Sequence, residues 1–514
     1  MNENRLIGHA ALAVAAAAFL ALCSGPLWDF DLWWHLSSGK FFFVNKRFMD
    51  SDPFTFTAGS ADIAGNPVLN GYWLGQVIMY LAYRAAGYYG IILLRAAVMT
   101  SALLSSYMLS RRLGAARSGA LALFAASGLL LADFTGERPQ LFSFLLFPHL
   151  FVLLESLRDG YGKGRRFHLH ALGLLCMMML WPSLHRGFLI GAALIAVYSG
   201  AEILDVMRGK REGGRPFAAF LAVAAVSLAA TMLSPNGSKA LSDVANLLNK
   251  SNEWQSTEFL SPVALALKHG YGLAAYWALL AFAAAALALS FRTARLSHMA
   301  VLTFLSALSL DSYRFIPFLL LLGLPIALGC MSGRWRQSRA FARISRAAAA
   351  AAVIMLLASA VAGYGRTLGA STSDPLMRGR FPKGAADFVM RNRPEGNMMN
   401  HYDWGGYLGW RLYPAYRVFI DGRSTSPRAL YDYRHILWNE KAYGMILDRY
   451  GVDIIIMMPD NPFTGERYDL VGFLARDPQW HMVYRDDISM VYLRGESNSS
   501  LIDSYGAAGR GPMP

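Results

Sequence analysis

The first cluster of side chains that can take part in catalysis or metal binding is the segment DFDLWWH at residues 29–35. It directly follows a long apolar run, so its carboxylates are expected at a membrane edge, where ionisable residues are costly and mark functional sites. Two carboxylates two residues apart can bind a divalent cation through oxygen ligands or supply a general base. A structural alternative is that Asp29 caps a helix while the tryptophans form an interfacial belt. That alternative leaves Asp31 and His35 unexplained.

A second cluster is the short segment DFTGERP at residues 133–139, between two apolar runs. Asp133 and Glu137 offer carboxylates that can complete a metal site. Arg138 offers a planar guanidinium suited to phosphate oxygens. An equally good interpretation is that Glu137 and Arg138 neutralise each other at a turn.

Two further arginines follow the same pattern, each at the end of an apolar run: Arg186 after His185, and Arg314 in the segment 311–314. Snorkelling explains a single arginine in such a place. Three of them on one face, counting Arg138, indicate an anionic ligand.

Two other segments combine acids with aromatic residues. The segment SNEWQSTE at 251–258 carries Glu253 and would suit a loop that folds over a bound acceptor, although an ordinary polar surface loop is favoured on spacing alone. The segments HYDWGGY at 401–407 and FIDGR at 419–423 fit either a recognition surface or a tight turn in which the fold requires the glycines.

The elements that must position these residues are mostly membrane helices. The 514 residues are 55% hydrophobic and 16% charged, whereas soluble domains are nearer a quarter charged. The net charge of +14 resides mainly in short loops, as in membrane anchors, so we expect no nucleic-acid partner. The three cysteines share no metal or disulfide spacing. About eleven apolar runs are predicted to span the membrane, near 6–26, 88–110, 118–133, 140–157, 168–183, 188–206, 216–233, 271–291, 297–310, 315–331 and 345–365.

The orientation follows from loop charge. Arginine and lysine clusters occupy every second connection, which the positive-inside rule places in the cytoplasm. We therefore expect an uncleaved first helix with a cytoplasmic N-terminus, and the alternate loops and everything after Gly365 outside. An amphipathic helix at 72–86 is expected to lie at the surface or to lead into the second span.

The part of the chain after Gly365 is predicted to fold as an α/β domain. The predicted domains are a membrane domain at 1–365, an extracytoplasmic α/β domain at 366–496 and a disordered tail at 497–514. Within the α/β domain the sequence pattern predicts helices at 384–392, 429–438 and 442–450, strands at 416–421 and 452–458, and a terminal hairpin of 480–484 with 488–493.

These features together resemble the GT-C superfamily of membrane glycosyltransferases, and distantly the catalytic subunit of oligosaccharyltransferase. Asp31 in its FDLW setting resembles the acidic residue that opens the first outer loop of that family. Ser251-Asn252-Glu253 is similar to the Ser-x-Glu element that positions the acceptor. The run Tyr402-Asp403-Trp404-Gly405 is similar to the aromatic-Asp-aromatic-Gly element of the exported domain. The chain is also similar to bacterial membrane proteins with an exported YDWGGYL segment.

The resemblance implies an inverting transfer of a sugar from a polyprenyl phosphate or diphosphate to a glycan, lipid or protein acceptor outside the bacterial inner membrane. Asp31 would be the base or a metal ligand, and Glu253 would orient the acceptor. Asp133, Glu137 and Arg138 would hold a divalent metal, Mg or Mn, or the phosphate. The carrier or acceptor would contact the remaining candidates, His35, Arg186, Arg314, Tyr402, Asp403 and Trp404.

Two other functions use the same residues. A transporter or flippase for a lipid-linked anion would use the outward arginines, but it would need charged or broken helices near the membrane centre, where this chain has few beyond Arg84 and Arg95. A non-catalytic scaffold would only present its exported domain to a partner.

Overall fold

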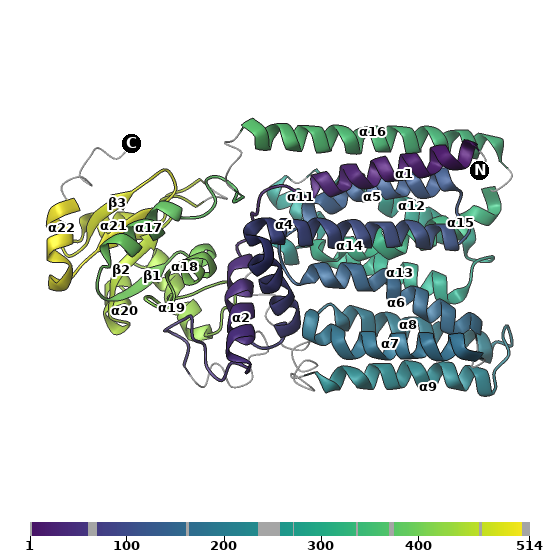
Figure 1. Ribbon diagram of the computed structural model, residues 1–514, viewed down its shortest axis with the longest axis horizontal. Coiled ribbons are helices and arrows are strands. Elements are labelled where there is room, and N and C mark those ends of the chain that lie inside the picture. The colour runs from purple at the N-terminus through teal and green to yellow at the C-terminus, as the bar shows by residue number, and fades with distance from the viewer. Residues whose placement is uncertain are drawn as a thin grey trace. The chain divides into compact units, whose positions relative to one another are not determined.

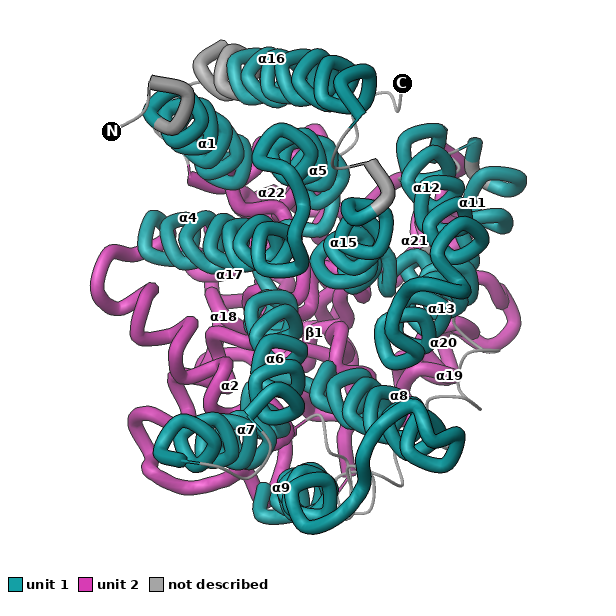
Figure 2. Tube along the Cα trace, turned by 90° about the vertical axis from the view of Figure 1, so that its right-hand side faces the viewer, with its two compact units in different colours: residues 1–25, 89–372 teal, residues 26–88, 373–514 magenta. Residues whose placement is uncertain are grey.

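The computed structural model describes residues 3–59, 69–160, 164–234, 257–270, 272–335, 338–369, 375–461 and 465–505 (Figure 1). The chain divides into two compact units (Figure 2). Unit 1 comprises residues 1–25 and 89–372, and unit 2 comprises residues 26–88 and 373–514. The first outer loop therefore groups with the C-terminal residues. The predicted division into 1–365 and 366–496 assigns this loop to the membrane domain instead.

Unit 1 is helical throughout its described residues. Its elements are α1 (Glu3–Leu22), the later part of α4 (Trp73–Arg112), α5 (Arg117–Leu131), η1 (Ala132–Phe134), α6 (Gln140–Gly160), α7 (Gly164–Leu184), α8 (Phe188–Met207), α9 (Arg215–Ala230), η2 (Thr231–Leu233), η3 (Thr257–Phe259), α11 (Pro262–His269), α12 (Ala274–Ser290), α13 (Leu296–Asp311), η4 (Tyr313–Phe315), α14 (Ile316–Phe318), η5 (Leu319–Gly323), α15 (Leu324–Trp335) and α16 (Arg339–Gly369).

These helices are suited to a lipid environment. Among the described residues, eight helices are long and apolar enough to cross a membrane, and three more apolar helices are shorter. Each of the eleven predicted apolar runs coincides with one of these helices, so the polytopic helical class is confirmed. The number of actual crossings stays a prediction.

Small residues allow the helices of unit 1 to approach closely, as is usual in membranes. Helix α16 packs on α1 and α5, and α6 packs on α7 (Figure 2). A Cβ on Gly191 of α8 would lie 2.8 Å from the Trp181 ring, and one on Gly128 of α5 would lie 3.1 Å from Leu103. Glycine at these positions therefore sets the spacing between neighbouring helices.

Unit 2 combines helices with one sheet. Its elements are α2 (Leu32–Asn45), the beginning of α4, α17 (Lys383–Asn392), β1 (Asn397–Asn400), η6 (Tyr402–Trp404), α18 (Gly405–Leu412), α19 (Pro427–Trp438), α20 (Tyr443–Arg449), β2 (Val452–Met457), α21 (Asp469–Arg476), β3 (His481–Arg485), β4 (Met490–Leu493), η7 (Glu496–Asn498) and α22 (Ser499–Tyr505).

The four strands have the order β1-β2-β4-β3. Strands β1 and β2 are parallel, and the two other pairings are antiparallel. The purely apolar run at the centre of β2 is buried because this strand lies between β1 and β4. The parallel pairing of β1 with β2 needs a long crossover, which α18, α19 and α20 provide. The predicted terminal hairpin is confirmed by β3 and β4.

The first outer loop is joined to the C-terminal residues by backbone hydrogen bonds. Leu27 N–H donates to Pro375 O at 2.9 Å, and Val418 N–H donates to Phe54 O at 2.9 Å. Helix α2 packs on α18, where the Trp33 ring meets Tyr407 edge-on at 4.9 Å between centroids. These bonds explain why residues 26–59 fold with a segment more than three hundred positions later in the sequence.

A buried ion cluster reinforces the same junction inside unit 2. Arg423 Nη2 lies 3.0 Å from Asp52 Oδ2 and 2.7 Å from Asp421 Oδ2, and all three side chains are at most 2% exposed. Thr55 and Thr425 donate hydroxyl hydrogen bonds to Asp52 at 2.7 and 3.1 Å. A buried charge without partners is strongly unfavourable, so Asp421 and Arg423 have a structural role.

Two local predictions differ from the structure, and a third, the helix at 72–86, agrees with one of its two alternatives. Instead of a regular strand, residues 416–421 contain isolated parallel bridges of Val418 with Thr55 and Met398, and Asn400 Oδ1 accepts the Phe419 N–H at 2.9 Å beside them. Residues 497–505 of the predicted disordered tail form helix α22 and part of η7, held by the Tyr505 ring against Phe388 at 5.2 Å. The predicted helix at 72–86 leads into the next span, since α4 continues through a bend at Ala86 and Gly87, whose φ is +59°.

Candidate functional site

Asp31 lies just before helix α2 and is held by its neighbours. Trp34 Nε1 donates to Asp31 Oδ1 at 2.9 Å, and the Asp31 backbone N–H donates to Asp29 Oδ1 at 2.9 Å. Asp29 is 2% exposed, so it stabilises the turn, while Asp31 is only half-buried. Trp33 and Trp34 are buried inside unit 2, so the interpretation of an interfacial tryptophan belt is wrong.

The C-terminal part of unit 2 completes the surroundings of Asp31. The Gly422 backbone lies against the Asp31 carboxylate and Trp34 Nε1, leaving no room for a side chain. Tyr402 shares a hydrogen bond of 2.8 Å with Ser424. Burial raises the pKa of Tyr402, and the carboxylates of Asp31, Asp421 and Asp403 raise it further. The structure therefore brings together two predicted site residues, Asp31 and Tyr402, that are far apart in the sequence.

Asp403 is a half-buried acid in the same region. Burial raises the pKa of its carboxyl to about 6, against the opposing effect of Arg380. Arg380 donates from Nε to Trp28 O at 2.8 Å and lies over the Phe30 ring at 4.1 Å. A carboxyl with such a pKa can exchange protons near neutral pH. Asp403 is thus the group in this region whose protonation responds most readily to ordinary changes of pH.

Two other predicted residues of unit 2 lie in its interior. Trp404 is fully buried and donates from Nε1 to Arg380 O at 3.1 Å. His35 is 3% exposed, lies against the Trp34 ring and is 3.1 Å from the Gln76 amide nitrogen. Both side chains support their neighbours, and their binding roles stay predictions.

Unit 1 contains a group of cations around His185, in the connection between α7 and α8. Burial and, to a lesser extent, the guanidinium groups of Arg314, Arg186 and Arg138 together lower the pKa of His185 to about 3. The Gly187 N–H donates to His185 Nδ1 at 3.0 Å, which fixes the ring. Three arginines from three different connections therefore lie near one neutral histidine, as the sequence pattern predicts for Arg138, Arg186 and Arg314.

The segment at 257–260 packs beside this arginine group. Arg138 Nη1 lies 2.8 Å from Glu258 Oε1, and the Arg314 guanidinium lies 4.5 Å above the Phe259 ring. The Ser312 hydroxyl donates to Glu258 O at 2.9 Å. Arg138 and Glu258 are 26% and 36% exposed, so this pair remains open to solvent and exchangeable. Glu253, predicted to orient the acceptor, lies outside the described residues.

Asp133 and Glu137, the two acids of the second cluster, differ in how deeply they are buried. Glu137 is fully buried and pairs with Arg95, which also donates to the backbone oxygens of Cys23 and Gly25. Asp133 is exposed at the end of α5. The interpretation that Glu137 neutralises Arg138 is wrong, because each has another partner in this structure. Arg95, one of the charged residues considered for a transporter, is thus part of an internal ion pair.

Metal binding finds no support in the ligand geometry. Within the part of the chain that the structure describes, no three His, Cys, Asp or Glu side chains are grouped so as to hold a metal ion. The roles predicted for Asp31, Asp133 and Glu137 with Mg or Mn therefore stay predictions, and the chemistry proposed for the protein does not depend on them.

Sequence reasoning missed several residues of these groups. Arg380 stands in a short basic segment with no distinguishing spacing, and Glu258 stands in a polar loop with no feature that sets it apart. The pairing of Arg95 with Glu137 joins residues 42 positions apart and has no local signal. Only the pair of Arg95 with Glu137 follows from the general rule that a buried charge needs a partner.

Comparisons with known proteins place the fold. No family model matches the chain, and no curated protein sequence does. Among solved structures, it is similar to the archaeal oligosaccharyltransferase AglB from Archaeoglobus fulgidus in complex with an inhibitory peptide and a dolichol-phosphate, with a TM-score of 0.59, 11% identity, and coverage of 96% of this chain and 75% of that one. It is also similar to ArnT from Cupriavidus metallidurans bound to undecaprenyl phosphate, with a TM-score of 0.51, 14% identity and full coverage of both chains.

Proposed function

Because the chain has the fold of the GT-C membrane glycosyltransferases, we propose that it transfers a sugar from a polyprenyl phosphate or diphosphate carrier to an acceptor at the extracytoplasmic face of the bacterial inner membrane. The fold alone does not determine activity, so the proposal depends on the side chains. The two neighbours were solved with dolichol-phosphate and undecaprenyl phosphate, which makes a polyprenyl phosphate the first ligand to test.

The observation that carries the proposal is the arginine group of unit 1. Arg138, Arg186 and Arg314 lie near enough to His185 to lower its pKa, and this low pKa keeps His185 uncharged. Guanidinium groups bind phosphate oxygens through paired, charge-assisted hydrogen bonds. In the predicted topology the three arginines lie in loops at the ends of membrane spans, where they could contact a lipid headgroup at the membrane surface. The arginines would hold the phosphate of the carrier and stabilise the negative charge that it gains on leaving.

Asp31 is the base in this proposal. An acceptor hydroxyl or amide attacks the anomeric carbon of the donor sugar, the bond from that carbon to the phosphate oxygen breaks, and the phosphate leaves with the electron pair. Asp31 accepts the proton that the attacking group loses. The indole N–H of Trp34 donates to Asp31 Oδ1 at 2.9 Å and so fixes the orientation of this carboxylate. A single displacement inverts the configuration at the anomeric carbon.

The test compares lipid-linked sugars and surface glycans by mass spectrometry in cells with and without the gene. Deletion should lead to accumulation of one polyprenyl-linked sugar and loss of one glycan modification. The wild-type gene should reverse both changes, and Asp31→Asn should not, although the variant protein reaches the membrane in equal amount.

The matched control is Asp50→Asn, which changes an exposed carboxylate of the same loop that pairs with Arg47. This variant should restore both the lipid pool and the glycan. Unchanged pools of every polyprenyl-linked sugar after deletion, or full restoration by Asp31→Asn, would contradict the proposal.

A further inference from the structure

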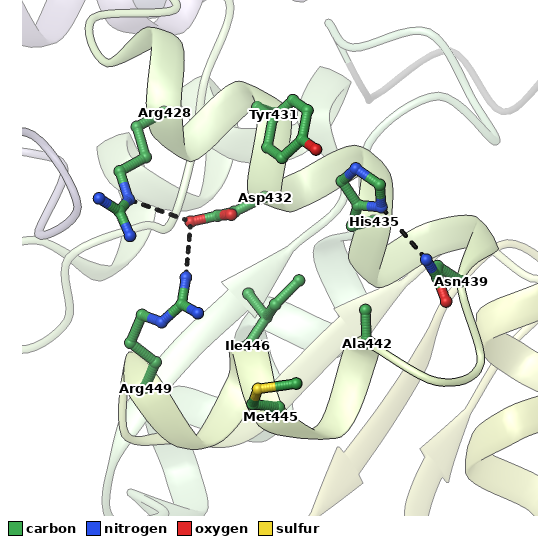
Figure 3. Close-up of a pocket in the computed structure, with 9 residues that line it drawn as sticks. All are labelled: Arg428, Tyr431, Asp432, His435, Asn439, Ala442, Met445, Ile446 and Arg449. Atoms are coloured by element: carbon green, nitrogen blue, oxygen red, sulfur yellow. Dashed lines mark hydrogen bonds and ion pairs between the residues drawn. The ribbon is translucent and has the colours of Figure 1, made fainter.

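A groove of about 530 Å³ lies between helices α19 and α20 of unit 2, in a region without any sequence-predicted site residue (Figure 3). Helix α19 contributes one wall with Tyr431 and His435, and α20 contributes the facing wall with Met445 and Arg449. This volume lies within the range of about 300–1,000 Å³ found for small-molecule sites. The groove can therefore hold a ligand of a few ring units.

The groove carries an excess of positive charge. Arg428 Nε lies 3.7 Å and Arg449 Nη1 3.6 Å from the same oxygen of Asp432, so two guanidinium groups share one carboxylate (Figure 3). Tyr450 already donates its hydroxyl to that oxygen at 2.8 Å. The side chains of Arg428 and Arg449 are 71% and 45% exposed, so their remaining N–H groups reach solvent. An anionic group would balance the charge that Asp432 leaves uncompensated.

Aromatic surface lies beside this charge. Tyr431 is 62% exposed, and its ring centroid lies 4.4 Å from that of His435 one helical turn later. Met445 is 63% exposed on the opposite wall. Asn439 lies 3.4 Å from His435 Nδ1 and adds an amide with its own donors and acceptor (Figure 3). The groove thus combines an aromatic ring face, an apolar side chain, guanidinium groups and an amide within one small space.

We infer that this groove binds an acidic saccharide. A sugar ring presents a face of C–H groups that can lie on an aromatic ring, and its hydroxyls need both donors and acceptors, which Asn439 and Asp432 offer. A carboxylate or phosphate substituent on the saccharide would pair with Arg428 and Arg449. The inference deepens the proposed function, on which it rests, by making an acidic glycan the acceptor class that this domain binds.

The binding test uses the purified full chain in detergent and two fluorescent oligosaccharides of equal length, an oligogalacturonate and a maltooligosaccharide. We expect the acidic oligosaccharide to bind more tightly than the maltooligosaccharide, and its binding to weaken as the salt concentration is raised. Tyr431→Ala and Arg449→Ala should each weaken its binding about tenfold or more, the loss of roughly one charged or stacked contact. Tyr431→Phe should retain binding because the ring remains.

The control is Arg476→Ala, which removes an exposed arginine that pairs with Glu440 outside the groove. It should bind as the wild type does. Equal binding by the wild type, Tyr431→Ala and Arg449→Ala would overturn the inference, and so would the absence of binding to either oligosaccharide. Capture of a protein through the groove, with no saccharide bound, would also overturn it.

The same variants separate this inference from the proposed function. Asp31→Asn should bind the acidic oligosaccharide normally while failing to transfer sugar. If Tyr431→Ala transfers sugar with an unchanged KM for the acceptor, the groove does not bind the acceptor, yet the glycosyltransferase proposal stands. If the wild type binds the oligosaccharide but consumes no polyprenyl-linked donor, the proposed function fails while binding by the groove remains.

Discussion

The backbone of Gly422 approaches Asp31 so closely that an added Cβ would overlap Asp31 Oδ1 and lie 3.3 Å from Trp34 Nε1. Asp31 could make room only by leaving its hydrogen bond with Trp34. The contact joins the first outer loop to the loop between α18 and α19, and it makes the position of the proposed base depend on a glycine nearly four hundred residues away.

Gly422→Ala should therefore lower the rate of sugar transfer with little change in folding. Displacing a catalytic group by about 1 Å can cost roughly 100-fold in rate, so we expect a loss of about that size. Initial rates with a saturating donor measure it. Gly444→Ala is the matched control, since no atom lies within 4 Å of the added Cβ. Equal rates for both variants would show that Asp31 tolerates displacement.

Arg314→Gln should weaken binding of the carrier phosphate. Loss of one charge-assisted contact of about 1.5–3 kcal/mol corresponds to roughly 10- to 100-fold weaker binding. Titration of the purified protein with undecaprenyl phosphate, followed by native mass spectrometry, measures the effect. Arg292→Gln, which changes an exposed arginine that lies over the Phe291 ring, should bind as the wild type does. The same affinity in both variants would argue against a phosphate site near His185.

The pH dependence of stability should report on Asp403. Its pKa of about 6 in the folded protein is above the ordinary value of 3.8, so the folded state holds this proton more tightly than the unfolded state. The contribution to stability is complete below pH 3.8 and is lost as the pH rises through about 6. Asp403→Asn keeps the group neutral, so its Tm should rise relative to the wild type over that interval.

Thermal unfolding of the protein in detergent between about pH 4 and pH 7.5 measures this difference. Asp487→Asn, at an exposed position of the same unit, should show no such change relative to the wild type. A constant difference in Tm between Asp403→Asn and the wild type would show that Asp403 is not desolvated in the folded protein.

Glu137→Gln should destabilise unit 1, because it leaves the Arg95 guanidinium buried without its counterion. Breaking a buried ion pair at one partner costs about 3–5 kcal/mol, whereas replacing both partners by apolar side chains is often neutral. The double variant Arg95→Leu/Glu137→Leu should therefore unfold at a higher temperature than Glu137→Gln. If Glu137→Gln is as stable as the wild type but inactive, Glu137 has the catalytic or metal role that the sequence suggested.

The membrane helices and the arginine group were accessible to sequence reasoning for one reason. Lipid demands long apolar runs, and every cationic residue at their ends stands out against them. Arg138, Arg186 and Arg314 each follow such a run, so a shared face could be predicted from the sequence alone. Helices of unit 2 such as α19 and α20 were also predicted, since their apolar periodicity is local.

Other parts of the molecule depend on contacts that no local pattern encodes. The strand β1 has the sequence NMMN, which has no strong preference for a β-strand, and it was not predicted. Its extended conformation depends on its pairing with β2. The segment 416–421 shows the reverse case, in which a β-like sequence bonds to the Asn400 side chain. One of the two alternatives for Glu137 paired it with its sequence neighbour Arg138, whereas its partner in the structure is Arg95 of α4.

The division of the chain into units also has a consequence for biosynthesis. Residues 26–59 need the backbone of Pro375 and Val418 and the side chain of Arg423 as partners, and these are synthesised more than three hundred residues later. At about 5–20 residues per second, the ribosome would need tens of seconds to synthesise the helices between, and during this time the Asp31 loop would lack its C-terminal partners. During that interval Asp52 has no guanidinium to neutralise it and Asp31 has no fixed position. A chain cut short before Arg423 would therefore reach the membrane with its apolar helices intact and its proposed base unformed.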